Sequence, residues 1–174
     1  MITVLHNVRS LHNVGSIFRT ADAAGIEKIY LCGITPTPVD RFGKIRPPIA
    51  KVALGAERTV PWDTSASLSA SSSAGSHSAS SGQALRATIL LLEKLKKENY
   101  TILALEQSPR AISYQKFKIQ KGKRYALVVG NEVRGLPKTI LKKADAILKI
   151  PMFGKKESLN VAVAFGIAVF RFRL

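Results

Sequence analysis

The sequence predicts an α/β fold, with a parallel β-sheet flanked by helices. In the first third of the chain a strand, a helix and a second strand follow one another, which is typical of parallel α/β sheets. A continuous apolar run from Tyr125 to Val129 is typical of a strand whose two faces are both covered by helices. The 174 residues suffice for one domain with a sizeable core, so we predict a single domain over residues 1–174.

The N-terminal elements follow from the spacing of apolar residues and from the prolines. Apolar residues recur at helical spacing from Val14 to Ala24, and Gly25 suits the position just after a helix. Four prolines and two glycines between residues 33 and 48 predict a loop. The predicted elements are a strand at 2–5, a helix from 13 to 24, a strand at 28–32, a helical turn at 49–54 and a candidate strand at 58–60.

Residues 65–82 break this pattern, because serine, alanine and glycine make up nearly all of them. Such a segment cannot bury enough apolar area to offset the entropy that it loses on ordering. We therefore predict a flexible insertion at about residues 63–82. The stretch before it is too short to form a core of its own, so the insertion does not mark a domain boundary.

The C-terminal half continues the alternation of helices and strands. Leu85, Ile89 and Leu92 fall on one face of an amphipathic helix, and Pro137 suits the first position of another. The predicted elements here are a helix at 84–99, strands at 101–105, 125–129 and 146–150, a basic connector at 116–124, a short helix at 137–143 and a final helix from 161 to 170.

The final helix has no polar face, because every residue from Val161 to Phe170 is apolar or glycine. A helix of this kind is buried, in a large core or against another subunit. A chain of this length has little room to surround a terminal helix, so we predict a homodimer that packs through this C-terminal helix. Ser158 and Asn160 have side chains suited to capping its first turn.

The charge balance favours a polyanionic partner. The chain has 27 Lys and Arg against 11 Asp and Glu, for a net charge of +16, and its pI is near 10.3. A pI above about 9 is typical of nucleic-acid binding, although a merely solubilising surface is the alternative. The candidate RNA contacts are Arg41, Lys44 and Arg46 in the proline-rich loop, with Lys155 and Lys156 near the last strand.

Several other classes of protein lack support in the sequence. No apolar run reaches the roughly 20 residues that cross a bilayer, and the N-terminus lacks the layout of a signal peptide. Cys32 is the single cysteine and the three histidines are scattered, so we expect neither a disulfide nor a metal site. The chain has no dinucleotide-binding G-x-G-x-x-G, no P-loop and no G-x-S-x-G. The expected location is the cytoplasm, away from membranes.

Three short motifs occur in order along the chain. They are N-x-G-x-x-x-R at 13–19, G-N-E-x-x-G at 130–135 and I-P-M-x-G-x-x-x-S-L-N-V at 150–161. Each is weak alone, but in this order they resemble the three motifs of the SpoU/TrmH-like RNA 2′-O-ribose methyltransferases of the SPOUT superfamily. The resemblance covers nearly the whole chain except residues 63–82. It implies a SPOUT-type fold with a C-terminal trefoil knot, a homodimer and S-adenosyl-L-methionine as the cofactor.

A pocket is expected where three strands end. Turns follow the predicted strands at 106–108, 130–135 and 151–154, and ligands of parallel sheets bind at the carboxyl ends of strands. The resemblance implies that this pocket holds the cofactor; ordinary turn glycines and a core-filling methionine are the alternative. The predicted cofactor-binding residues are Leu105, Glu106, Gly130, Asn131, Gly135, Ile150, Met152 and Leu159.

The resemblance also implies catalytic roles. Arg19 matches an arginine that acts on the ribose 2′-hydroxyl. Because a guanidinium stays protonated, we expect Arg19 to hold a phosphate and to stabilise the developing alkoxide. A surface ion pair with Asp22 or Glu27 is the alternative. Glu132 is expected to orient Arg19, or the arginine of the second subunit, unless it caps the helix near Pro137.

The remaining motif positions are polar. Asn13 matches an RNA-contacting asparagine, although a simple helix cap is the alternative. Ser158 and Asn160 match positions that line the pocket near the transferred methyl group. We therefore predict a methyltransferase that acts on a ribose 2′-hydroxyl of tRNA or rRNA. A non-catalytic RNA-binding protein of the same fold and a base-methylating SPOUT enzyme are the alternatives, and only the enzyme requires Arg19.

Overall fold

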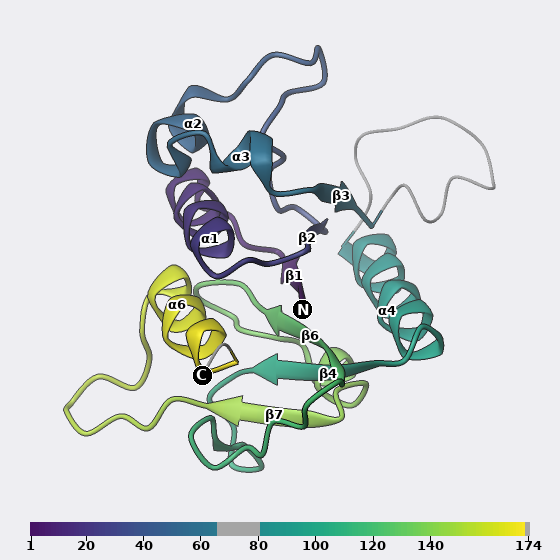
Figure 1. Cartoon of the computed structure of the whole chain (residues 1–174), viewed down its shortest axis with the longest axis vertical. Coiled ribbons are helices and arrows are strands. Elements are labelled where there is room, and N and C mark those ends of the chain that lie inside the picture. The colour runs from purple at the N-terminus through teal and green to yellow at the C-terminus, as the bar shows by residue number, and fades with distance from the viewer. Residues whose placement is uncertain (66–80, 173–174) are drawn as a thin grey trace.

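A sheet of parallel strands lies at the centre of the molecule (Figure 1). The computed structural model describes residues 1–65 and 81–172. Its strands are β1 (Ile2–His6), β2 (Lys28–Cys32), β3 (Trp62–Thr64), β4 (Tyr100–Leu105), β5 (Ile112–Ser113), β6 (Arg124–Val129) and β7 (Ala146–Lys149). They are arranged in the order β3-β2-β1-β6-β4-β7-β5, and each neighbouring pair is parallel. The predicted parallel α/β fold is confirmed.

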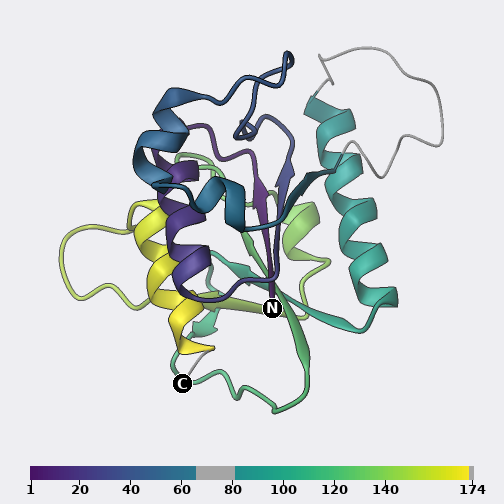
Figure 2. The same ribbon diagram turned by 45° about the horizontal axis from the view of Figure 1, so that its top comes forward.

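Helices cover both faces of the sheet (Figure 2). They are α1 (Leu11–Ala23), α2 (Pro47–Ala53), α3 (Ala56–Thr59), α4 (Ser81–Lys97), α5 (Lys138–Leu141) and α6 (Val161–Arg171). Helices α1, α2, α3 and α6 share one core, and α4 and α5 share the other. Along β6, Leu127 and Val129 belong to the first core and Ala126 and Val128 to the second. This alternation explains the unbroken apolar run of that strand.

Three predicted boundaries in the N-terminal third are wrong. The first helix begins at Leu11, because the Ser10 side chain accepts from Asn13 N and so caps it two residues earlier than predicted. Pro47 belongs to α2 rather than to the loop. The N–H of the first residue of a helix has no partner within the helix, so a proline, which has no N–H, is tolerated there. The candidate strand at 58–60 is instead helix α3 followed by β3, which pairs with β2.

The serine-rich segment is shorter than predicted. Residues 63 and 64 belong to β3, and α4 begins at Ser81. The predicted flexibility concerns residues 66–80, which lie outside the described residues. Pro137 precedes α5 as its N-cap rather than opening it, and the helix ends at Leu141 instead of residue 143.

Helix α6 is buried on one side only. Phe165, Ala168 and Val169 are fully buried in the first core. Val163, Ile167 and Phe170 keep 51, 37 and 45% of their surface exposed. A single chain therefore does not bury the apolar final helix completely. Of the two predicted explanations for this helix, burial in the core of one chain is not sufficient. None of the helices described is long and apolar enough to cross a membrane.

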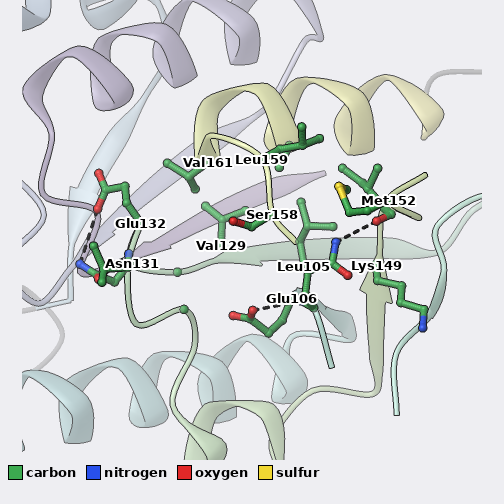
Figure 3. Close-up of a pocket in the computed structure, with 16 residues that line it drawn as sticks. Leu105, Glu106, Val129, Asn131, Glu132, Lys149, Met152, Ser158, Leu159 and Val161 are labelled. Atoms are coloured by element: carbon green, nitrogen blue, oxygen red, sulfur yellow. Dashed lines mark hydrogen bonds between the residues drawn. The ribbon is translucent and has the colours of Figure 1, made fainter. Parts of the chain in front are cut away.

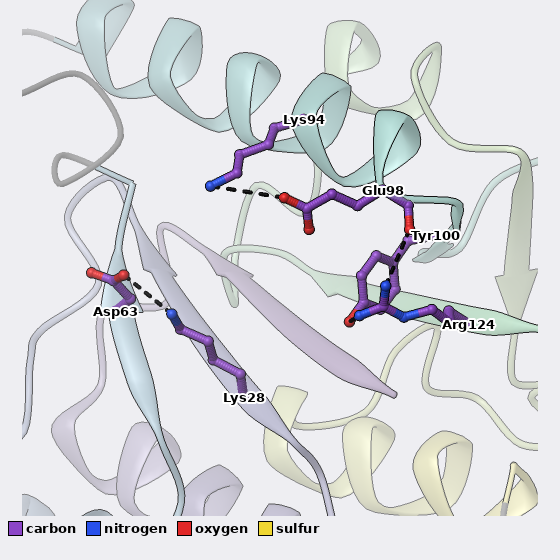
Figure 4. A network of polar contacts seen from close by, with 6 residues as sticks. All are labelled: Lys28, Asp63, Lys94, Glu98, Tyr100 and Arg124. Carbon is purple, nitrogen blue, oxygen red and sulfur yellow. Dashed lines mark hydrogen bonds and ion pairs between the residues drawn. The ribbon is translucent and has the colours of Figure 1, made fainter. Parts of the chain in front are cut away.

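Polar contacts hold the amino ends of the strands (Figure 4). The Arg124 guanidinium lies 4.0 Å from the centre of the Tyr100 ring and donates to the Tyr100 hydroxyl and to the Glu98 carbonyl. Lys28 Nζ donates to Asp63 Oδ2 at 3.2 Å, which joins β2 to β3.

Candidate active site at the carboxyl edge of the sheet

A cavity of about 150 Å³ lies at the carboxyl ends of β6, β4 and β7, which are adjacent in the sheet (Figure 3). Its walls come from the turns after these three strands and from the segment that leads into α6. All eight residues predicted to bind the cofactor line it, together with Glu132 and Ser158. The carboxyl ends of the strands and the three motifs thus meet at one place.

Glu106 joins the turn after β4 to the turn after β6. Its carboxylate accepts from Leu136 N at 2.6 Å and from Gln107 N at 3.0 Å. Gly135 has a φ of +62°, and a Cβ there would lie 2.3 Å from Glu106 Oε2. A Cβ on Gly130 would lie 2.7 Å from the carbonyl carbon of Gly135. Gly130 is therefore required by close approach of the backbone, and Gly135 by its positive φ and by the Glu106 carboxylate beside it.

The opposite wall is apolar and is fixed by one hydrogen bond. Gln107 Nε2 donates to the carbonyl oxygen of Ile150 at 2.8 Å, which ties the turn after β4 to the end of β7. Leu105, Met152 and Leu159 supply apolar surface nearby. Polar backbone edges facing an apolar wall are typical of a site for a small organic ligand.

Glu132 holds the two residues that precede α1. Its carboxylate accepts from the backbone N–H groups of Arg9 and Ser10 at 3.0 to 3.2 Å, and from Asn13 Nδ2 at 3.0 Å. Burial alone would raise the pKa of Glu132, but the amides of Ser10 and Arg9 outweigh it and lower this pKa below its usual value. The carboxylate is thus ionised at the positive end of the α1 dipole. The predicted capping of the helix near Pro137 is wrong.

Side-chain amides connect the three motifs. Asn160 Nδ2 donates to Asn13 Oδ1 at 3.0 Å, and Asn13 Nδ2 donates to Glu132 Oε1 at 3.0 Å. We call Asn160, Asn13 and Glu132 the amide chain. Asn160 Oδ1 also accepts from Ala162 N at 2.9 Å, so Asn160 caps α6 as predicted. Asn13 lies within the first turn of α1, and its predicted role as the N-cap is wrong because Ser10 has that role.

Two positive helix ends therefore meet beside the cavity. The N-termini of α1 and α6 are joined through the amide chain. The Glu132 carboxylate already balances the positive end of α1, whereas α6 is capped only by the neutral Asn160 side chain and still favours negative charge. Among the described residues no group of three or more His, Cys, Asp or Glu side chains could hold a metal ion. The arrangement can bind a nucleoside-like ligand and stabilise a developing negative charge next to it.

Arg19 does not reach this cavity within one chain. It is exposed on α1 and is absent from the cavity lining. Within the described ranges it forms no ion pair: Asp22 accepts from the Thr59 hydroxyl, and Glu27 binds the N-terminal amino group. The predicted orientation of Arg19 by Glu132 of the same chain is therefore wrong, and so is the predicted surface ion pair.

The predicted RNA contacts lie on exposed loops. Arg41 and Lys44 are exposed in the loop before α2, where the Arg41 guanidinium lies 4.7 Å from the centre of the Phe42 ring. Arg46 is half-buried, and its Nε has no hydrogen-bond partner among the described residues. Lys155 and Lys156 are exposed in the segment that leads from the cavity to α6.

Some lining residues were not predicted. Val129 and Lys149 end their strands, so the rule that ligands bind at strand ends could have identified them. The hydrogen bonds from the backbone N–H groups of Arg9 and Ser10 to Glu132 could not be predicted in this way. Almost every residue has a backbone N–H, so the sequence does not show which of them a distant side chain binds. The unpredicted lining residues are Gln107, Val129, Val133, Lys149, Val161 and Ala164.

Comparison with known proteins agrees with this geometry. Residues 49–170 match the SpoU rRNA Methylase family. The 23S rRNA (guanosine-2′-O-)-methyltransferase RlmB of Ralstonia nicotianae is 31% identical over 170 residues, which cover 98% of this chain and 57% of that protein. RlmB of Escherichia coli K12 is 30% identical over 171 residues, covering 97 and 58%. The chain thus spans a little over half the length of these relatives.

Solved structures give the same picture. The AdoMet-bound rRNA methyltransferase from Sinorhizobium meliloti superposes with a TM-score of 0.75 at 27% identity, over 99% of this chain and 55% of that one. The TrmH/SpoU tRNA modifying enzyme of A. aeolicus superposes with a TM-score of 0.73 at 26% identity, over 99 and 74%. The fold of nearly the whole chain therefore has counterparts of known structure.

Proposed function

The chain belongs to the SpoU rRNA methylase family, and we propose on that premise that it transfers the methyl group of S-adenosylmethionine to a ribose 2′-hydroxyl of rRNA or tRNA. The observation that carries the proposal is the amide chain. It joins one residue from each of the three motifs beside a cavity lined by the eight predicted cofactor-binding residues. Relatives named as 23S rRNA 2′-O-methyltransferases and a neighbour named as a tRNA modifying enzyme support RNA as the substrate class.

The residues present fit the cofactor. Gly130 and Gly135 let the turn after β6 pack closely on itself and on Glu106, where a Cβ would clash, and this packing fixes the polar main-chain edge that lines the cavity. Leu105, Met152 and Leu159 offer apolar surface to an adenine ring. When bound, S-adenosylmethionine supplies an electrophilic methyl group. The described residues that would hold it are those of the turns after β4, β6 and β7.

The chain's own residues would position the attacking ribose. Glu132 accepts from several N–H groups at once, so it fixes the N-terminus of α1 rather than moving a proton. Asn13 and Asn160 are held in one orientation by their mutual hydrogen bond. The N-terminus of α6, which is capped by the neutral Asn160 side chain, then favours the negative charge that develops on the 2′-oxygen.

Arg19 is proposed to act across a homodimer. Helix α6 packs on α1 close to Thr20, since a Cβ on Gly166 would lie 3.7 Å from the Thr20 methyl carbon. Arg19 is the exposed residue before Thr20 on the same helix, and α6 leaves an apolar stripe of Val163, Ile167 and Phe170 exposed. If two chains pack through this stripe, each Arg19 is carried into the interface, where it can hold an RNA phosphate and stabilise the alkoxide at the cavity of the other subunit.

Three further features complete the proposal. We infer that residues 1–174 act as one methyltransferase domain in the cytoplasm. We also propose the trefoil knot of the SPOUT superfamily. Family membership supports it, and so does the segment 150–160, which lines the cavity together with the turns after β4 and β6.

The test is methyl transfer from labelled S-adenosylmethionine to unmethylated rRNA and tRNA, followed by complete nuclease digestion and separation of the nucleosides. The proposal predicts label in a 2′-O-methylated nucleoside. Label in a methylated base would show a base-methylating enzyme instead. RNA that is bound but never labelled, at any cofactor concentration, would show a binding protein without the activity.

A further inference from the structure

A second, larger cavity lies on the other side of the loop after β6. It has a volume of about 770 Å³, and it is bounded by that loop, by the segment after β1 and by the beginning of α4. Asn131, Val133 and Gly135 line both cavities. The loop 131–135 is therefore a shared wall between the candidate active site and this second cavity, which we call the α4 cavity.

The floor of the α4 cavity is rigid. Asn7 has a φ of +59°, and this left-handed conformation is held from three sides. Its backbone N–H donates to the Cys32 carbonyl, its Oδ1 accepts from Ile34 N at 3.0 Å, and its carbonyl accepts from Asn131 Nδ2 at 2.8 Å. A non-glycine residue keeps such a conformation only where its surroundings impose it. The floor is thus already formed without a ligand.

The floor is also uncharged. His6 lies between Thr88 Oγ1 at 3.0 Å and Asn7 Nδ2 at 3.1 Å. Asn7 donates to Nε2, so the proton of the ring resides on Nδ1 and is donated to Thr88, whose hydroxyl donates on to the Ala84 carbonyl. This polar row links β1 to α4, and among the described residues that line the cavity only Arg9 and Arg134, at its lips, are charged.

The lips of the α4 cavity combine apolar and cationic side chains. Ile34 and Val133 keep 59 and 92% of their surface exposed, which is high for large apolar residues at the edge of a cavity. Arg9 and Arg134 also line it and are exposed, and within the described ranges neither forms an ion pair. Leu85 adds a further apolar wall.

We propose that the α4 cavity binds an unpaired base of the RNA substrate, from a nucleotide next to the one that is methylated. Proteins read single-stranded RNA by placing splayed-out bases on apolar surface or on guanidinium planes, with cations on the adjacent phosphates. Here the apolar walls suit the base, and Arg9 and Arg134 suit the phosphates. The net charge of +16 attracts a polyanion such as RNA to the surface that carries this cavity.

The position of the cavity agrees with this occupant. The Arg9 side chain lines the α4 cavity, whereas its backbone N–H donates to Glu132 in the amide chain. An RNA strand whose ribose lies at the amide chain can therefore place a neighbouring base across the loop 131–135. The inference rests on the proposed function, because the occupant belongs to the same RNA.

The test compares Ile34→Ser and Leu85→Ser, at residues that line the α4 cavity and not the candidate active site, with Leu90→Ser. Leu90 is a large apolar residue of α4 with 49% of its surface exposed, and it lies outside the cavity lining, so it is the matched control. The probes are short single-stranded oligoribonucleotides, each intact or with one base removed to leave the sugar and phosphate. Affinity for these RNAs and for S-adenosylmethionine is measured for every variant, along with methyl transfer to rRNA and tRNA.

Each cavity variant should lose the contact with one stacked base, so we expect its affinity for intact RNA to be about tenfold lower than that of the wild type. The RNA affinity of the control variant and the affinity of every variant for S-adenosylmethionine should be unchanged. The same variants should not distinguish intact RNA from RNA that lacks the bound base. If the cavity variants bind and methylate RNA as the control does, this inference is overturned and the proposed function stands. A wild type that binds S-adenosylmethionine but no RNA would overturn both.

Discussion

Asn13 is the central residue of the amide chain. It donates to Glu132 and accepts from Asn160, so a single side chain connects the start of α1 with the β6 turn and with the start of α6. Its neighbours are 119 and 147 residues away in sequence. The three motifs are therefore coupled through one residue, and this coupling can be broken by one substitution.

Asn13→Ala should weaken both the fold and the activity. Two hydrogen bonds are lost, so the free energy of unfolding should fall by about 1 to 2 kcal/mol, as measured by urea denaturation. Methyl transfer should fall much further than the affinity for S-adenosylmethionine, since Asn13 does not line the cofactor cavity. The control is His12→Ala, at an exposed neighbouring position of α1. Equal methyl transfer by the two variants would contradict the proposed coupling.

Gly135→Ala should abolish cofactor binding. An added Cβ would lie 2.3 Å from the Glu106 carboxylate, in a backbone conformation that costs an L-residue about 1 to 2 kcal/mol. The Glu106 side chain must then move, which disrupts its bond to Leu136 N. Calorimetric titration with S-adenosylmethionine measures the loss. Gly154→Ala is the control, because nothing lies within 4 Å of a Cβ there, and equal affinity of both variants would refute the close-approach argument.

His6 should make the fold sensitive to mild acid. Burial lowers the pKa of His6 from 6.5 to about 4, so between these values the unfolded chain binds a proton that the folded chain does not. The resulting stability is complete above pH 6.5 and is lost as the pH falls toward 4, by roughly 3 kcal/mol. Urea denaturation across this pH range measures it.

His6→Gln removes the titrating group, so its free energy of unfolding should depend less on pH in that range, even though its stability at pH 7 is lower. His12→Gln, at an exposed position, should follow the wild type. Identical pH profiles for all three proteins would show that His6 does not control this transition.

At the scale of elements, the sequence predicted the type of most helices and strands but not all their ends. Hydrophobic periodicity depends on many residues, so the amphipathic helix α4 and the apolar strand β6 could be recognised. A helix end depends on one capping contact. Ser10 and Asn13 are both good capping residues, and only the fold determines that Ser10 caps α1.

The site was predictable where it depends on strand ends and motifs. Parallel strands end at one edge of the sheet, so the turns containing Glu106, Gly130 and Met152 could be expected to meet. The partners of Glu132 were not predictable, because the residues it holds lie at the other end of the chain. The position of Arg19 outside the cavity was equally hidden, since it depends on which face α1 presents to its neighbours.

At the scale of the molecule, the two edges of the sheet differ. The amino edge carries ion pairs and the contact of Arg124 with Tyr100 beside a cavity of its own, whereas the carboxyl edge carries the three motifs and two cavities that share the loop 131–135 as a wall. The described part of α6 leaves an apolar stripe exposed, and α6 packs on α1, the helix that carries Arg19.

Ile167→Glu should convert a dimer into a monomer. The substitution places a charge in the middle of the exposed α6 stripe, where burial against a second chain would be strongly unfavourable. Light scattering coupled to gel filtration measures the mass, and Leu90→Glu on α4 is the control. The variant should also lose methyl transfer. Unchanged mass in Ile167→Glu would exclude α6 as the interface.

The most direct test of the central claim is the rate of methyl transfer to RNA by the wild type and by Arg19→Ala, each measured beside its affinity for S-adenosylmethionine. The account predicts a 2′-O-methylated product from the wild type. It also predicts a rate lower by roughly a hundredfold or more in the variant, with cofactor affinity largely kept. Lys51→Ala, at an exposed position of α2, should retain the full rate. A wild type that makes no 2′-O-methyl product, or an Arg19→Ala variant as fast as the wild type, would contradict the account.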